Sequence, residues 1–127
     1  MPKHDFGVFL RCCLEIPKDV IILKQSEEDG RLIFRLPTKK RIIEFIGNAG
    51  LEQVSFVNTE EWRNNFDKSY PLYVDAYEFR TLNKLGYIAI IRNERQGKWI
   101  VKSFHLSKND PSQEIVGLLG TKQIGSI

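Results

Sequence analysis

The chain contains few of the residues on which secreted, metal-binding and membrane-spanning proteins depend. It has two cysteines, and because they are adjacent, at Cys12 and Cys13, they make neither a disulfide framework nor a four-ligand metal site. Its two histidines, His4 and His105, are too few for a transition-metal site. No apolar run approaches the roughly 20 residues of a membrane-spanning helix, and Arg11 interrupts the one stretch that could resemble a signal peptide. We therefore expect a cytoplasmic protein that binds no metal, no cofactor and no membrane.

The sequence also lacks the motifs of common nucleotide-dependent and metal-dependent enzymes. It contains no HExxH zinc motif, no Walker lysine loop, no dinucleotide-binding glycine fingerprint and no EF-hand spacing of acidic residues. Hydrophobic residues make up 42% of the chain and charged residues 28%, a balance that argues against disorder. With 127 residues the chain is long enough for one domain and too short for two. We expect a single domain over residues 1–127, with 120–127 as a loose tail.

The clearest structural pattern lies in the third quarter of the chain, residues 72–106. Three runs rich in β-branched and aromatic residues, 72–79, 85–92 and 98–106, each have the length of a strand. Short polar turns, the first at Asn83-Lys84, separate them. Connections this short can join only antiparallel neighbours. The sequence therefore predicts a three-stranded antiparallel meander.

The first part of the chain gives mixed signals. Apolar residues alternate through 6–16 as in a strand, with Cys12 on the buried side, although the same stretch also fits a helical spacing. We favour the strand and keep the helix as the alternative. Residues 20–36 combine an apolar run, the turn dipeptide Asp29-Gly30 and a second, alternating run, which together predict an N-terminal hairpin. A further short strand is expected at 51–57.

Short helices should pack on this sheet. Thr38 can cap a helix over residues 38–47. Asn58 and Glu61 have the spacing of a capping box at the start of a second helix. Asp110-Pro111 can begin a last short helix that ends at residue 119. The predicted fold class is α+β, with an antiparallel sheet, made of the meander and the N-terminal hairpin, packed with two or three short helices.

Positive charge is concentrated on the predicted meander. The formal net charge is +3, yet residues 71–108 alone carry seven Lys and Arg against three Asp and Glu. Such a face can bind phosphate groups, or it can be an ordinary solvated surface whose cations guard an edge strand. A second basic cluster begins the helix at 38–47, either as an exposed patch or as a phosphate site. The candidate nucleic-acid-binding residues are Lys39, Lys40, Arg41, Arg92, Lys98 and Lys102.

One face of the meander could carry chemistry. If Arg92 pairs with Lys98, Tyr87 lies opposite Ser103, and the odd-numbered residues, including His105, share that face. Two cations fall near the same end of the face. The candidate catalytic residues there are Arg80, Tyr87, His105 and Lys108.

A histidine, a phenol and two cations suit cleavage of RNA without a metal ion. A base must take the proton of the ribose 2′-OH, an acid must protonate the leaving oxygen, and cations must stabilise the charged phosphorane. The alternative is purely structural, with Tyr87 packing on the sheet and His105 held by a hydrogen bond.

Three segments of the meander resemble the RelE/ParE toxin superfamily, which includes the MqsR-type ribonucleases. They are DAYEFR at 75–80, GYIAI at 86–90 and IVKSFH at 100–105, within the last third of the chain. The resemblance implies that Arg80 contacts phosphate, that Tyr87 lies on the active surface, and that His105 or Lys108 acts as acid or base. It also implies an antitoxin partner. The hairpin expected at 20–36 departs from the compact toxins, which usually begin with one strand.

Two functions follow from these patterns. The first is a small metal-independent ribonuclease of toxin type that acts on RNA phosphodiester bonds. The alternative is a non-enzymatic binding domain that uses the basic sheet face and an exposed part of Trp62 or Trp99 to hold a protein or nucleic-acid partner. A hydrolase with Cys12 or Cys13 as nucleophile is the weakest hypothesis, because only His4 is near in sequence and alternation would bury Cys12.

Overall fold

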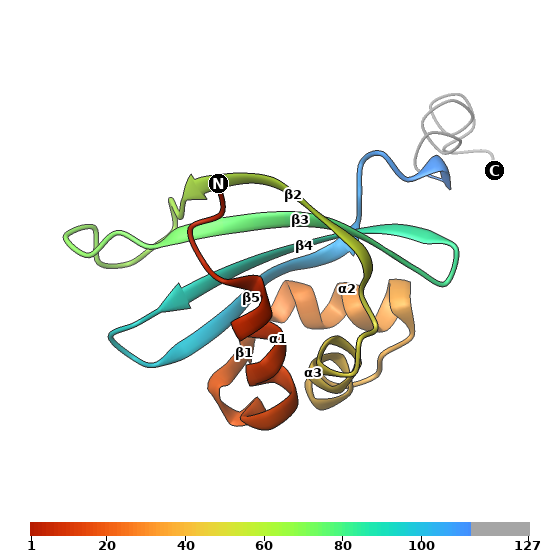
Figure 1. The fold of residues 1–127 in the computed structure, drawn as a ribbon, viewed down its shortest axis with the longest axis horizontal. Helices are drawn as coiled ribbons and strands as arrows, with labels where there is room; N and C mark the ends of the chain where they lie inside the picture. Colours follow the sequence, from red (N-terminus) through yellow and green to blue (C-terminus); the bar gives the residue numbers. More distant parts are fainter. Residues whose placement is uncertain (113–127) are drawn as a thin grey trace.

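The computed structural model describes residues 1–112, in which three α-helices lie on one face of a five-stranded sheet (Figure 1). The described elements, in chain order, are α1 (Phe6–Glu15), the single 3-10 turn η1 (Pro17–Asp19), β1 (Val20–Ile22), α2 (Lys24–Phe34), α3 (Lys39–Gly47), β2 (Glu52–Glu61), β3 (Tyr73–Thr81), β4 (Lys84–Asn93) and β5 (Lys98–Leu106). The strand order is β1-β5-β4-β3-β2. β1 runs parallel to β5, and the other neighbouring pairs are antiparallel.

The α+β class and the mostly antiparallel sheet are confirmed. β3, β4 and β5 nearly coincide with the three predicted runs, and their connections are as short as the sequence indicated. The sheet is not a meander plus an N-terminal hairpin. The short strand expected at 51–57 is part of the longer β2, which pairs antiparallel with β3, and β1 pairs in parallel with β5 at the opposite edge.

The predicted N-terminal strand and hairpin are wrong. Residues 6–15 form α1, with Asp5 as its N-cap accepting a hydrogen bond from the Val8 backbone N–H at 3.1 Å. The helix buries Phe9 and Cys13, which lie one turn apart, and leaves Cys12 only partly covered. The helical alternative for this stretch was therefore correct, and the expectation that Cys12 lies in the core was not.

Residues 20–36 form a short strand followed by α2 rather than a hairpin. The Asp29-Gly30 dipeptide lies inside this helix, where the absence of a side chain on Gly30 permits close packing. A Cβ there would lie 2.6 Å from Ile42 Cδ1 and 3.3 Å from Phe104 Cδ2. The glycine is thus used for contact between α2, α3 and β5, not for a turn.

Of the remaining helix predictions, one is confirmed, one is wrong and one lies mostly outside the described residues. α3 begins where expected, with the Thr38 hydroxyl accepting from the Arg41 backbone N–H at 3.1 Å. The helix predicted after Asn58 is wrong, because β2 continues through that residue, which pairs with Ala76 of β3. The predicted helix from Asp110 to residue 119 lies mostly outside the described residues, and the tail at 120–127 lies wholly outside them. In the described part, the Asp110 carboxylate accepts a hydrogen bond from the Ser112 backbone N–H at 2.8 Å.

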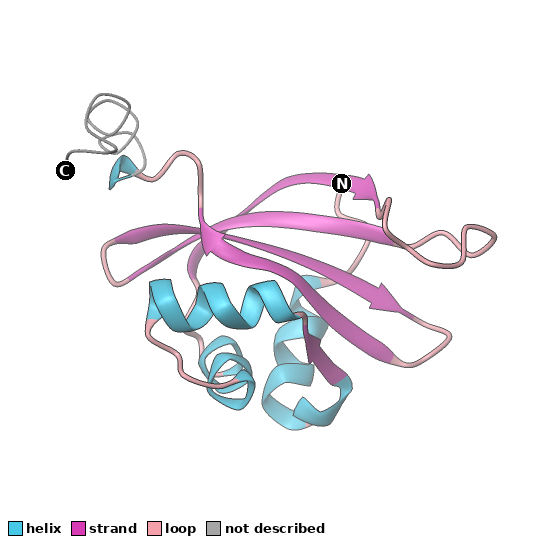
Figure 2. Cartoon of the chain, turned by 180° about the vertical axis from the view of Figure 1, so that it is seen from behind, coloured by secondary structure: helices cyan, strands magenta, loops and turns pink. Residues whose placement is uncertain are grey.

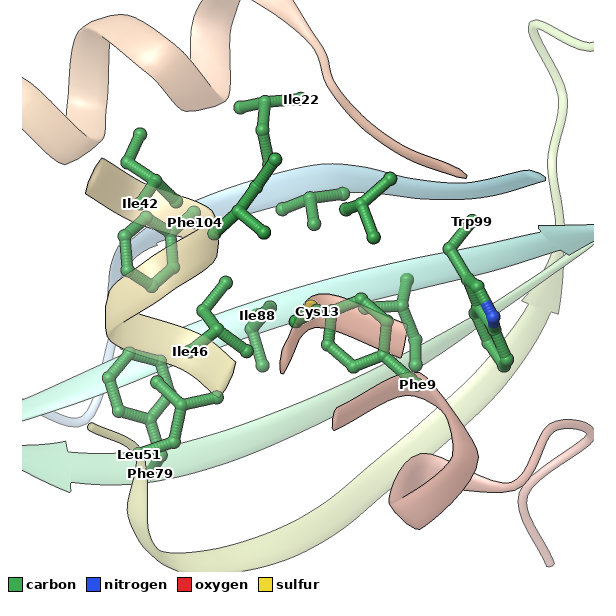
Figure 3. Close-up of a cluster of buried hydrophobic side chains, with 14 of the residues drawn as sticks. Phe9, Cys13, Ile22, Ile42, Ile46, Leu51, Phe79, Ile88, Trp99 and Phe104 are labelled. Atoms are coloured by element: carbon green, nitrogen blue, oxygen red, sulfur yellow. The ribbon is translucent and has the colours of Figure 1, made fainter. Parts of the chain in front are cut away.

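The main core lies between the helices and the sheet (Figures 2 and 3). Apolar side chains of the three helices meet those of β3, β4 and β5, including Phe9, Ile42, Phe79, Ile88 and Phe104, all fully buried. Burial of these side chains stabilises the packing of the helices on the sheet. Within the described residues, no helix is long and apolar enough to cross a membrane.

The sheet face turned away from the helices is here called the open face. One end of it carries a second, smaller cluster of Leu72, Ile91 and Ile100, with Trp62 and Tyr70 packed against them. These contacts show that the 62–72 loop between β2 and β3 folds over that end. Within residues 1–112, no helix lies on the rest of the open face (Figure 2). Glu78, Tyr87 and His105 are only partly buried there, so this part of the sheet is available for a site.

Candidate active site

Three polar side chains form a row across the open face. Glu78 of β3 is paired with Tyr87 of β4, and Tyr87 is paired with His105 of β5. The Tyr87 and His105 rings are stacked, with centroids 5.0 Å apart and planes 15° from parallel. This row, Glu78–Tyr87–His105, is the centre of the candidate site.

The register that produces the row differs from the predicted one. Asn93, not Arg92, pairs with Lys98, and a bulge then leaves Lys102 without a partner between the pairs of Ala89 and Ile90. The bulge reverses the alternation of β5. Odd-numbered residues face the helices before it, and even-numbered residues face them after it. Trp99 and Val101 consequently face the helices, and Tyr87 lies directly opposite His105 rather than Ser103.

Burial keeps Tyr87 protonated, and a hydrogen bond determines the tautomer of His105. Burial, reinforced by the nearby Glu60 carboxylate, raises the pKa of Tyr87 above its usual 10.0, so the phenol stays protonated at neutral pH. His105 Nδ1 lies 2.7 Å from the Leu106 carbonyl oxygen, which can only accept a hydrogen bond. Nδ1 therefore donates and carries the proton, and Nε2 is the basic nitrogen of the neutral ring.

Glu78 is the residue of the row that sequence reasoning missed. Hydrogen bonds from the Ser107 hydroxyl and the Asn109 amide lower the pKa of its carboxyl, and Lys108 and Arg80 lower it further. The carboxylate is therefore ionised. Two-residue alternation along the strand could have placed it on the face of Arg80, but its pairing with Tyr87 depends on the strand register.

Three cations flank the row. Arg80 and Lys108 lie close enough to Glu78 to lower the pKa of its carboxyl. Lys102 lines a cavity together with Tyr87. None of the three belongs to an ion pair among residues 1–112. The structure thus brings the four candidate catalytic residues to one region of the open face.

The candidate nucleic-acid-binding residues are not gathered in the same way. Arg92 lies over the Trp99 ring at 5.3 Å and pairs with Glu94 at 3.5 Å. Lys98 pairs with Asp19 at 3.1 Å. The remaining three, Lys39, Lys40 and Arg41, begin α3 in the helix layer on the other side of the sheet. Of the six, only Lys102 lines the cavity beside Tyr87, so the predicted basic face is divided.

The cavity beside the row has a volume of about 390 Å³. Ala76 and Ala89, paired across β3 and β4, form its floor, with Tyr87 on one side and Trp62 of the 62–72 loop on another. Asn58 of β2, opposite Ala76, extends it toward the edge of the sheet. We call this cavity the alanine trough. Trp99, in contrast, is 4% exposed and packs against Phe9 of α1, on the other side of the sheet.

The cysteines do not form a second active site. Burial raises the pKa of Cys13 to about 12, and burial together with Asp19 raises that of Cys12. Both thiols are therefore protonated, which opposes a role as nucleophile. Within residues 1–112, no three His, Cys, Asp or Glu side chains converge in a way that could hold a metal ion.

Comparisons with protein-family models, with curated proteins and with solved structures find no match to this chain.

Proposed function

We propose that the protein is a small metal-independent ribonuclease of toxin type whose active site is the Glu78–Tyr87–His105 row. The observation that carries this proposal is the pairing of His105, with Nε2 as its basic nitrogen, and a protonated Tyr87, flanked by three cations that belong to no ion pair among residues 1–112. This is the set of groups that RNA transesterification requires.

The reaction can be assigned to these side chains step by step. His105 Nε2 takes the proton of a ribose 2′-OH, and the 2′ oxygen attacks the adjacent phosphorus. The bond from phosphorus to the 5′ oxygen breaks, and the Tyr87 phenol protonates that leaving oxygen. Arg80 and Lys108 stabilise the negative charge of the phosphorane. The products are a 2′,3′-cyclic phosphate and a 5′-hydroxyl, and the imidazolium then returns its proton to Tyr87.

The test is cleavage of end-labelled single-stranded RNA by the purified protein in the presence of EDTA. Loss of a general base typically costs about 100-fold or more in rate, so His105→Ala should lose at least that much. The matched control is His4→Ala, which removes the other histidine, on the helix side of the sheet. A folded wild type that leaves RNA intact, or equal rates for wild type and His105→Ala, would refute the proposal.

A second candidate function is a non-enzymatic binding domain. It is favoured by the carboxylates of Glu78 and Glu60 on the open face, which oppose a polyanion, and by the presence of a preformed cavity. A toxin would act in the cytoplasm, and an antitoxin would inhibit it by covering the open face. A binding domain would instead use the open face to hold its partner. Binding without cleavage, unchanged by His105→Ala, would support the second candidate.

A further inference from the structure

We propose, building on the ribonuclease activity proposed above, that the alanine trough is a subsite for a guanine base next to the cleaved phosphate. Tyr87 belongs both to the row and to the wall of the trough, so a base held there lies beside His105. The trough would thereby determine where the RNA is cut.

The shape of the trough suits a planar ring. Alanine is a poor strand former, yet Ala76 and Ala89 stand opposite each other in the middle of the sheet and leave a hollow between larger neighbours. They are only 2% and 1% exposed, so the larger side chains around them cover most of the floor. The aromatic side chains of Tyr87 and Trp62, which line it, offer surfaces for base stacking.

The polar groups of the trough select among the bases. The Asn58 amide donates to Glu60 Oε2 at 3.2 Å and holds that carboxylate at the outer side of the cavity. A carboxylate accepts two parallel hydrogen bonds from neighbouring donors. Guanine has such a pair, N1–H and the N2 amino group, side by side on its Watson–Crick edge. Adenine, cytosine and uracil present no two adjacent donors there.

The opposite side of the trough supplies a donor. Lys102, the unpaired residue of the β5 bulge, lines the same cavity as Glu60, three strands away. Three strand spacings amount to about 14 Å between the two backbones, and both side chains line the cavity between them. Guanine carries the acceptors O6 and N7 on the side toward the ammonium group. A base of this kind therefore offers donors to the Glu60 carboxylate and acceptors to the Lys102 ammonium group, in a cavity that Glu61 and Arg63 also line.

Calorimetric titration with nucleoside 3′-monophosphates tests the subsite without depending on cleavage. We expect guanosine 3′-monophosphate to bind about tenfold more tightly than the inosine form, which lacks the N2 amino group, because one hydrogen bond to a charged acceptor is lost. Adenosine 3′-monophosphate should bind more weakly still. Glu60→Gln should remove this preference, and Glu44→Gln, the same change on the exposed side of α3, should preserve it.

Two outcomes separate this subsite from the proposed activity. RNA cleavage at every base, with equal binding of the three nucleotides, would support the ribonuclease and refute the guanine subsite. Guanine-selective binding without any cleavage would support the subsite and refute the ribonuclease. In a cleaved oligonucleotide, replacing the guanine before the cut by inosine should slow cleavage about tenfold through the same lost hydrogen bond, and an unchanged rate would refute the assignment of Glu60.

Discussion

At the scale of single residues, Glu78 links the candidate site to the acid stability of the fold. Its carboxylate is ionised and accepts hydrogen bonds from Ser107 and Asn109, with a pKa below the usual 4.5. As the pH falls, the unfolded chain binds this proton first. The stabilisation is therefore complete above pH 4.5 and is lost as the pH falls through the lower folded value.

Replacing Glu78 by glutamine should remove the contribution of this carboxyl to the pH dependence of stability. We expect Glu78→Gln to lower the free energy of unfolding at neutral pH and to approach the wild-type value in acid well below pH 4.5, as the native carboxyl also becomes protonated. Urea unfolding of both proteins at the two pH values measures the difference. A difference that stays constant would contradict the assignment of an ionised, hydrogen-bonded Glu78.

At the scale of elements, the chain after β5 positions Lys108 by binding back to the start of β4. The Asp110 carboxylate, 3% exposed, accepts from the Leu85 backbone N–H at 2.6 Å, and the Ser107 backbone N–H donates to the Leu85 carbonyl at 2.9 Å. Burial alone would raise the pKa of Asp110, but hydrogen bonds from Ser112 and Leu85 outweigh it and lower the pKa.

Asp110→Ala should release this connection. The Leu85 N–H loses its acceptor, and a backbone donor left unsatisfied costs about 1–3 kcal/mol, so we expect a loss of stability of that size. Amide hydrogen exchange should be faster at Leu85 and unchanged at Ile90 in the middle of β4. Equal exchange at Leu85 in both proteins would show that the Asp110 hydrogen bond does not hold the segment.

Sequence motifs predicted an element correctly where tertiary packing favours the same local structure. The capping residue Thr38 and the strand runs of β3 to β5 were read correctly, because burial of the same residues supports them. The Asp29-Gly30 and Asn58–Glu61 signals failed because contacts with distant parts of the chain override them. The row of Glu78, Tyr87 and His105 could not be derived in full, since the bulge at Lys102 is fixed by strand pairing rather than by any local motif.

At the scale of the whole molecule, the helices cover one face of the sheet and leave most of the open face to the candidate site (Figure 2). If this face cuts RNA, expression of the wild type should arrest growth and degrade total RNA. His105→Ala and Arg80→Ala should restore growth while remaining folded, because each removes one group from the site. Normal growth and intact RNA with folded wild-type protein would contradict a toxin function.

The most direct test of the central claim is the chemistry of the RNA ends that the purified protein produces. In the proposed mechanism the ribose 2′-OH is the nucleophile, activated by His105 Nε2. The wild type should leave 2′,3′-cyclic phosphate ends in the presence of EDTA, and a 2′-deoxy substitution at the cleaved nucleotide should abolish the cut. Intact RNA, or equal cleavage of the 2′-deoxy substrate, would contradict the assignment of the row as an active site.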